Sequence, residues 1–341
     1  MLSFLSDYTE GAHPAVLQAL AESNLVSLPG YGEDAYCRQA KEKLRAFCGA
    51  ADADVYFLTG GTQANLIVIS TLLRRYEAVL CAATGHINVH EAGAVEYTGH
   101  KVVPLPAVDG KLPADGLSDY IRRFYADESH SHMPFPGMVY IAHPTELGTL
   151  YTRAELEALS AVCRQYGMKL FLDGARLGYG LVSPASDLTI HDIVRCCDVF
   201  YIGGTKVGAL CGEALVFPRH GMPAHFDTMV KQQGAMLATG RLLGVQFDAL
   251  FTDGLYLRIS RHAVALALEL KAALVSKGYE LLIDSPTNQQ FVVLDNEKLG
   301  ALRQRVAFNI WEPVDERRTA IRLVTSWATE KSSVEALIEL L

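Results

Sequence analysis

The stretch KLFLDGAR, from Lys169 to Arg176, shows most directly how this chain folds. A short apolar run, Lys169–Leu172, leads into an aspartate and a glycine, which is typical of a buried strand that ends in a turn. Ligands bind at the carboxyl ends of the strands in open α/β sheets, so Asp173 lies where a ligand-binding carboxylate is expected. Taken alone, the stretch is better explained by an ion pair between Asp173 and Arg176, or by a capping aspartate.

Six further runs of this kind occur in the first two thirds of the chain. Each is short, rich in β-branched or aromatic residues, and bounded by Gly, Pro, Asp or Thr, with amphipathic helical segments between the runs. The runs are Val55–Leu58, Ala78–Cys81, Lys101–Leu105, Met138–Ile141, Val199–Ile202 and Ala214–Phe217. This alternation predicts an α/β fold in which helices cover both faces of a mostly parallel sheet.

The pattern changes past about residue 240. A long helical stretch runs from Leu242 towards Lys277, with a break near Asp253-Gly254, and a closing helix begins at about Lys331. Strand-like runs lie between them, at Tyr279–Ile283, Gln290–Leu294 and Ile321–Thr325, with a possible fourth at Val306–Ile310. We therefore expect a large domain over 1–245, which begins with an arm over 1–13, and a small α+β domain over 246–341.

Composition narrows the classes of function. The chain has 341 residues, half of them hydrophobic, and a net charge of −8, which argues against binding to nucleic acid or to an anionic membrane. Its seven cysteines form no CxxC motif, which favours reduced thiols in a reducing compartment. No apolar run approaches the roughly 20 residues of a membrane span, and no Cys/His/Asp set has metal-ligand spacing. We expect a soluble, cytoplasmic protein without a metal.

Two glycine-containing stretches carry further chemistry. TGGTQAN, at 59–65, links a strand-like run to an apolar helix, where free backbone N–H groups and the Thr62 hydroxyl suit an anion such as phosphate. An ordinary turn capped by Thr62 explains this stretch equally well. In GGTK, at 203–206, Lys206 follows a buried run, where desolvation would lower its pKa and favour a Schiff base. An exposed loop lysine is the common alternative.

The order of these three features is more informative than any one of them. A turn for phosphate, an acid for a pyridine nitrogen and a Schiff-base lysine are what pyridoxal 5′-phosphate (PLP) requires. They occur in this order at the ends of three strand-like regions. The sequence therefore predicts a PLP enzyme.

The sequence resembles the PLP-dependent threonine aldolases of the β-eliminating lyase group, which have the fold type I aminotransferase architecture. The resemblance covers nearly the whole chain. The stretches that carry it are Ser6-Asp7, Tyr31-Gly32-Glu33-Asp34, TGGTQAN at 59–65, HINVHEAG at 86–93, DGARL at 173–177, GGTK at 203–206 and RLVT at 322–325. It implies a mostly parallel sheet between helices and a small α+β C-terminal domain.

The resemblance implies a role at the cofactor for five residues. Lys206 would hold PLP as a Schiff base, and Asp173 would pair with the pyridinium nitrogen. Gly61 and Thr62 would bind the phosphate. His86 would stack on the ring, close to the substrate hydroxyl.

It also implies the residues that bind the substrate. Arg176, which would lie at the cofactor as well, and Arg322 would clamp the substrate carboxylate, with a contribution from Ser6. Glu91 matches an active-site glutamate, and Tyr31 lies in another active-site stretch.

The chain departs from the family at two places. One concerns recognition of the substrate's β-substituent, and the other concerns binding of the cofactor phosphate. Some relatives carry a histidine followed by Asn and Gly, and that imidazole helps to read the β-substituent. In this chain the stretch is His143–Gly148, with Glu146 at about that position. Relatives also carry an arginine for the phosphate where Lys231–Leu237 lacks one, so Lys231 or Arg241 would substitute.

The expected reaction is aldol cleavage of an L-3-hydroxy-α-amino acid, such as threonine or allo-threonine, to glycine and an aldehyde. Lys206, His86 and Asp173 are the expected catalytic residues. Other PLP reactions on this scaffold (β-elimination, racemisation or transamination) remain alternatives, as does a non-catalytic binding protein. The resemblance further implies a homodimer or homotetramer with active sites at the subunit interface.

Overall fold

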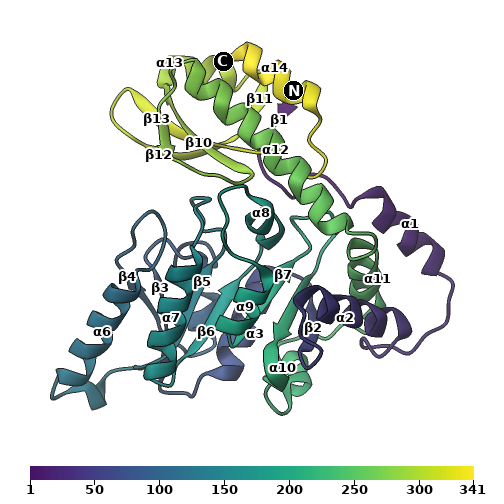
Figure 1. Cartoon of the computed structure of the whole chain (residues 1–341), viewed down its shortest axis with the longest axis vertical. Coiled ribbons are helices and arrows are strands. Elements are labelled where there is room, and N and C mark those ends of the chain that lie inside the picture. Colours follow the sequence, from purple (N-terminus) through teal and green to yellow (C-terminus); the bar gives the residue numbers. More distant parts are fainter.

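The computed structural model describes all residues from 1 to 341, and a seven-stranded sheet forms its centre (Figure 1). The strands are β2 (Asp54–Leu58), β3 (Glu77–Ala82), β4 (Val102–Leu105), β5 (Phe135–Ala142), β6 (Lys169–Asp173), β7 (Val199–Gly203) and β8 (Glu213–Phe217). Their order is β2-β8-β7-β6-β5-β3-β4, and β8 alone runs opposite to the other six strands. Each predicted run falls in one strand, apart from Lys101, which precedes β4, and this confirms the mostly parallel sheet.

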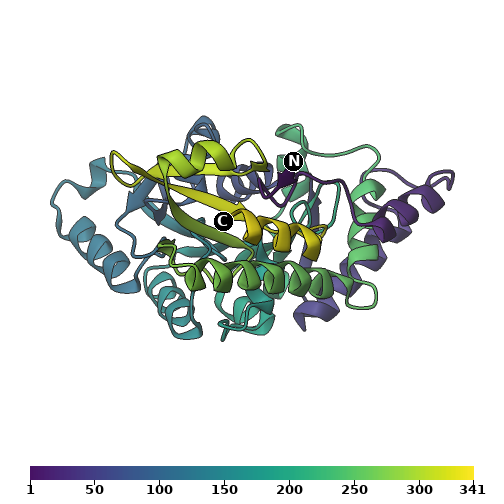
Figure 2. The ribbon, with the colours of Figure 1, turned by 90° about the horizontal axis from the view of Figure 1, so that it is seen from above.

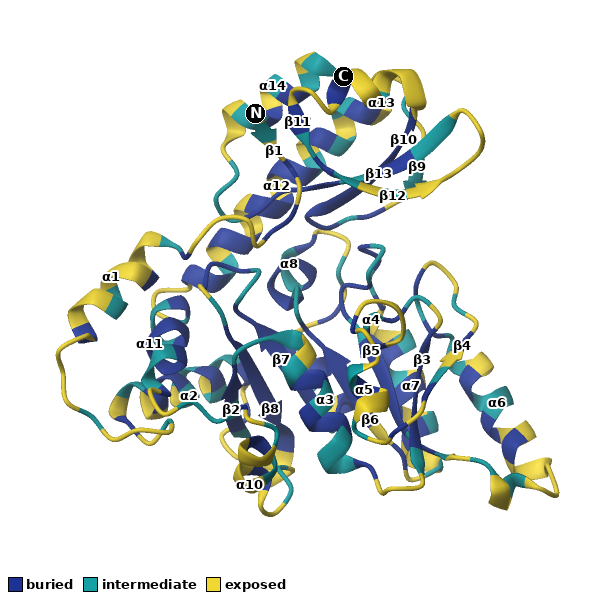
Figure 3. Ribbon diagram, turned by 180° about the vertical axis from the view of Figure 1, so that it is seen from behind, coloured by how far each residue is buried: buried dark blue, intermediate teal, exposed yellow.

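Both faces of this sheet are covered by helices because successive strand residues point to opposite faces. In β6, Leu170 and Leu172 face one apolar core, and Phe171 faces the other. The helices of the first face are α2 (Ala35–Cys48), α6 (Ala114–Ala126), α7 (Arg153–Gln165) and α9 (Ile190–Cys196). Those of the second are α3 (Gly61–Leu72), α5 (Ala94–Tyr97) and α10 (Phe226–Gln232). Figure 3 shows the resulting buried strands at the centre.

A smaller antiparallel sheet follows two helices, α11 (Arg241–Leu250) and α12 (Leu255–Ser276). The predicted break near Asp253-Gly254 falls between them, and Gly254 caps α12 with a φ of +66°. The elements of this C-terminal region are β9 (Leu281–Ile283), β10 (Gln289–Asp295), α13 (Asn296–Leu302), β11 (Val306–Ala307), β12 (Asn309–Pro313), β13 (Arg318–Val324) and α14 (Lys331–Leu340). The sheet order is β12-β13-β10-β9, and α12 contacts both α14 and α8 (Leu177–Val182).

The N-terminal arm packs against this C-terminal sheet. Strand β1 (Leu2–Ser3) pairs in parallel with β11, and the Val324 N–H donates to the Phe4 carbonyl at 2.9 Å. Phe4 is fully buried in the small apolar core there. After the arm, α1 (Pro14–Ser23) packs against α11 at one end of the molecule (Figure 2). The start of the chain is therefore brought beside Arg322.

None of the helices combines the length and apolarity needed to cross a lipid bilayer.

Candidate active site

A cleft of about 980 Å³ opens at the carboxyl edge of the large sheet. Segments that follow β2, β3, β5, β6 and β7 line it on one side, and β12, β13 and Tyr8 of the arm complete it. The predicted site residues that line this cleft are Gly61, Thr62, His86, Asp173, Arg176, Lys206 and Arg322. The topology thus brings together residues from the whole length of the chain.

Asp173 ends β6 and is held by a polar network. The Tyr140 hydroxyl donates to its Oδ2 at 2.5 Å, the Asn65 amide donates to the same oxygen at 3.2 Å, and the Ala175 N–H donates to Oδ1 at 3.0 Å. Burial acts to raise the pKa of Asp173, but His86 and the hydrogen bonds outweigh it, so the pKa is lowered. Asp173 is therefore an oriented carboxylate, and the alternative ion pair with Arg176 is not formed.

His86 begins the short helix α4 (His86–Val89) and is fixed from behind by an acid. Its Nδ1 lies 2.7 Å from Oε1 of Glu91, whose side chain is fully buried. The Asn65 amide donates to that oxygen at 2.7 Å as well as to Asp173. Asn65 therefore connects the His86–Glu91 pair to Asp173. This role of Asn65 was not predicted from its stretch, TGGTQAN; its signal is a polar residue within an apolar helix.

Lys206 follows β7 and is half-buried in the cleft. Burial, and then the positive charge of Arg176, lower the pKa of its ammonium. Its backbone is fixed because the buried Tyr179 hydroxyl donates to the Lys206 carbonyl at 2.5 Å. A lysine with a lowered pKa on a fixed backbone can act as a nucleophile towards an aldehyde.

The turn at Gly60-Gly61 opens α3 without a side-chain cap, and Thr62 is exposed in the cleft. The backbone N–H groups there are available to an anion. A Cβ added to Gly61 would lie 3.0 Å from the Tyr201 hydroxyl, so this glycine keeps the turn close to the sheet. The turn, Asp173 and Lys206 line one cleft, and together they fit the predicted PLP.

The two arginines of the expected clamp differ in their surroundings. Arg176 donates twice to Asp7, from Nε to Oδ2 at 2.7 Å and from Nη2 to Oδ1 at 2.9 Å. Arg322 lies over the Trp311 ring, donates to Gln289 at 3.2 Å, and has a buried Nε without a partner. Unlike Arg176, Arg322 therefore has no carboxylate partner within the chain and keeps more of its N–H donors unused.

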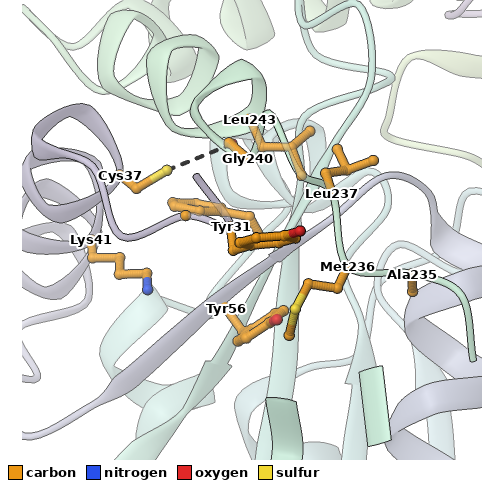
Figure 4. Close-up of a pocket in the computed structure, with 11 residues that line it drawn as sticks. Tyr31, Cys37, Lys41, Tyr56, Ala235, Met236, Leu237, Gly240 and Leu243 are labelled. Atoms are coloured by element: carbon orange, nitrogen blue, oxygen red, sulfur yellow. Dashed lines mark hydrogen bonds between the residues drawn. The ribbon is translucent and has the colours of Figure 1, made fainter. Parts of the chain in front are cut away.

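Three of the predicted substrate residues do not line the cleft: Glu91, which lies behind His86, and also Ser6 and Tyr31. Ser6 is buried beside Asp7, and its Oγ has no hydrogen-bond partner. Tyr31 lies in a separate small pocket between α2 and residues 235–243 (Figure 4). Its ring is half exposed and lies 5.1 Å from Nζ of Lys231. Within one chain, Tyr31 is thus not brought to Lys206.

Two further buried acids, Glu146 and Glu213, line the cleft. Glu146 accepts from the His86 N–H at 2.8 Å, and burial raises its pKa to about 7. Glu213 begins β8 and is 3% exposed. In the sequence, Glu213 is an acid directly before an apolar run. Such an acid is typical of an ordinary strand end, so it did not indicate a functional residue.

Comparison with known proteins agrees with this geometry. A family model described as beta-eliminating lyase matches residues 3–297. The low specificity L-threonine aldolase of a Pseudomonas species is 32% identical over 342 residues, which cover 98% of this chain and 95% of that protein. A structure of Leishmania major threonine aldolase superposes with a TM-score of 0.96 at 42% identity and covers 100% of this chain and 98% of that one.

A more distant structure shares the fold alone. Aspartate aminotransferase from Thermus thermophilus superposes with a TM-score of 0.70 at 14% identity, and covers 100% of this chain and 90% of that one. Because the family model spans most of the chain and a relative above 30% identity spans nearly all of it, the chain belongs to the beta-eliminating lyase family.

Proposed function

We propose that this chain is a PLP-dependent lyase that cleaves L-3-hydroxy-α-amino acids of the threonine type to glycine and an aldehyde. The observation that carries the proposal is the meeting of Lys206, Asp173 and the unused donors of Arg322 in one cleft. The similarity to threonine aldolases over nearly the full chain supports this reaction over others of the fold.

In this proposal, four residues hold the cofactor. Lys206 binds its aldehyde carbon, Asp173 keeps a proton on the ring nitrogen, and Gly61 and Thr62 donate to its phosphate. Bound PLP supplies an electron sink for the electron pair that remains when the Cα–Cβ bond breaks. A carboxylate with a lowered pKa suits the role of Asp173, because it stays ionised beside a protonated nitrogen.

The substrate side of the cleft has its own assignments. Arg322 binds the amino acid's carboxylate, and Arg176, held by Asp7, shapes the same end of the cleft with Ser6. His86, held by Glu91, stacks on the cofactor ring and accepts the proton of the β-hydroxyl, either directly or through a water.

Identification of the products tests the proposal against the other PLP reactions. Purified protein with PLP and L-threonine should yield glycine and acetaldehyde in equal amounts, and Lys206→Ala should yield neither. Ammonia with a 2-keto acid would instead indicate elimination, and conversion to D-allo-threonine without cleavage would indicate racemisation at Cα. A colourless protein that takes up no PLP, and that borohydride does not label at Lys206, would favour a binding protein.

Assembly and location are also part of the proposal. Large apolar side chains are exposed near α1, including Leu25 at 94% and Tyr31 at 53%, and support a homodimer with its sites at the interface. Pairing of two dimers would give a homotetramer. Seven free cysteines, six of them buried, support a reducing cytoplasm.

A further inference from the structure

Glu213 stands between two segments that the proposed function assigns to the cofactor. It is the first residue of β8 and pairs in register with Leu58 of β2 and with Gly203 of β7. Strand β2 leads into the turn at 59–62, and β7 leads to Lys206. The Glu213 side chain lines the cleft although the residue is only 3% exposed. Its carboxyl group is therefore built into the floor of the site.

The two oxygens of this carboxyl group have unequal surroundings. Oε1 accepts from the Thr205 hydroxyl at 2.8 Å, and that hydroxyl oxygen accepts in turn from the Gly212 N–H at 3.0 Å. Oε2 is buried and has no hydrogen-bond partner. A buried acceptor without a donor is unfavourable, whereas a protonated Oε2 is itself an O–H donor.

The electrostatic surroundings favour the protonated form. Burial raises the pKa of Glu213 to about 8, and nearby Asp173 acts in the same direction, against Thr205 and Lys206. The titratable side chains that interact electrostatically with Glu213 are Lys206, Asp173, Tyr201, Tyr256 and Cys211. A phosphate ester is close to a dianion above pH 7, since its second pKa is about 6, and would repel an ionised carboxylate here.

We propose that Glu213 is a neutral hydrogen-bond donor to the phosphate of the cofactor, with Oε1 fixed by Thr205 and the proton carried on Oε2. The proposal rests on the proposed function, which places that phosphate at Gly61 and Thr62. It adds a donor in a chain whose 231–237 segment lacks an arginine, but it adds no positive charge. Affinity for the phosphate therefore decreases as the pH rises and Glu213 ionises.

The test compares two ligands that cannot bond covalently to Lys206. Pyridoxine 5′-phosphate and pyridoxine carry an alcohol in place of the aldehyde, and the ratio of their Kd values for the cofactor-free full chain measures the preference for phosphate. Calorimetry at pH 7 to 9.5 should show this preference falling about tenfold in the wild type, because affinity can change up to about tenfold per pH unit beyond a pKa. In Glu213→Gln, which keeps a donor that cannot ionise, the preference should match the wild type at pH 7 and stay constant. A Glu213→Gln profile that falls like that of the wild type would overturn the proposal.

Lys206 titrates too, so Lys206→Ala is the second variant. A pH-dependent preference that persists in Lys206→Ala supports Glu213, and a preference that becomes constant assigns the effect to the ammonium and overturns the proposal. This comparison decides the matter even where Glu213→Gln fails to fold, as circular dichroism would show. A wild type with no preference for phosphate at pH 7 would instead contradict the placement of the cofactor, and hence the proposed function itself.

Discussion

The guanidinium of Arg176 is held by the carboxylate of Asp7 through two hydrogen bonds, although 169 residues separate them. Asn288 donates to the same carboxylate at 2.9 Å and also to the Thr325 carbonyl at 2.9 Å. One aspartate of the arm thereby joins the end of β6 to the segment before β10. The Asp7 side chain is fully buried and that of Arg176 is 12% exposed, so neither charge is solvated.

Asp7→Asn should lower the free energy of unfolding by about 3–5 kcal/mol, because it leaves Arg176 buried without its counter-charge. Urea denaturation at pH 7 measures this change. The matched control is Asp119→Asn, which breaks an ion pair with Arg122 on the surface of α6 and should cost less than about 1 kcal/mol. An equal change in the free energy of unfolding for the two substitutions would show that the buried ion pair stabilises the fold no more than the surface pair does.

The contribution of Asp7 should depend on pH. Burial acts to raise its pKa, but Arg176, Lys206 and the hydrogen bonds outweigh burial, so the pKa lies below its usual value of 3.8. The ionised form therefore stabilises the fold fully above about pH 4, and this stabilisation is lost as the pH falls through the lowered pKa. The stability difference between wild type and Asp7→Asn should be constant from pH 7 to pH 5 and should shrink towards pH 3. A difference that is unchanged at pH 3 would exclude an electrostatic origin.

Arg322→Gln should raise the KM for L-threonine by about 100-fold, since two charge-assisted hydrogen bonds to a carboxylate contribute about 3 kcal/mol. The absorption of bound PLP should not change, because Arg322 is not assigned to the cofactor. Arg317→Gln, at an exposed position before β13, is the control and should leave KM unaltered. A change in kcat alone would place Arg322 away from the carboxylate.

Asp173→Asn should retain PLP, because Lys206 and the phosphate turn are untouched. Turnover should fall by at least about 100-fold, comparable to the loss of one oriented electrostatic group in other enzymes, since an amide cannot keep the ring nitrogen protonated. Absorption spectra report the retained cofactor and initial rates report kcat. Activity close to that of the wild type would refute the role of Asp173.

Mixing Tyr31→Ala with Lys206→Ala should restore part of the activity if two subunits share each site. Tyr31 lies outside the cleft of its own chain, so its predicted role at the substrate requires a second copy. Hybrid dimers would contain one site in which neither residue is altered. Subunit exchange followed by mass measurement shows whether hybrids form; hybrids without activity would exclude Tyr31 from the neighbouring site, and a monomer by light scattering would exclude the shared site altogether.

The large sheet could be predicted because each strand carries a local signal. The run at 199–202, for example, is apolar, rich in β-formers and ended by glycines, and β7 occupies Val199–Gly203. The strands of the C-terminal region were harder to predict. The single run expected at Val306–Ile310 is divided between β11 and β12, because its two parts pair with different strands, β1 and β13. The division of the chain at residue 245 stays a prediction.

Some residues of the site could likewise be predicted from a local sequence pattern, whereas others are brought together only by tertiary contacts. Asp173 and Lys206 each follow a recognisable strand, so their meeting at one edge of the sheet follows from topology. The bonds from Asp7 to Arg176 and from Asn65 to Glu91 join segments that are far apart in the sequence, and no periodicity reports such a pairing. Tertiary contacts of this kind decide which arginine is left without a carboxylate partner.

The pairing of β1 with β11 has a consequence for how the molecule is made. The arm is synthesised about 300 residues before the strands that bury Phe4 and the strand that carries Arg322. Until then Leu2 and Phe4 have no native partner, and the cleft lacks one wall. A translation product truncated before β11 would therefore contain the complete lysine and phosphate segments and still be unable to enclose an amino acid, so the nascent chain acquires its substrate pocket only after β13 has been made.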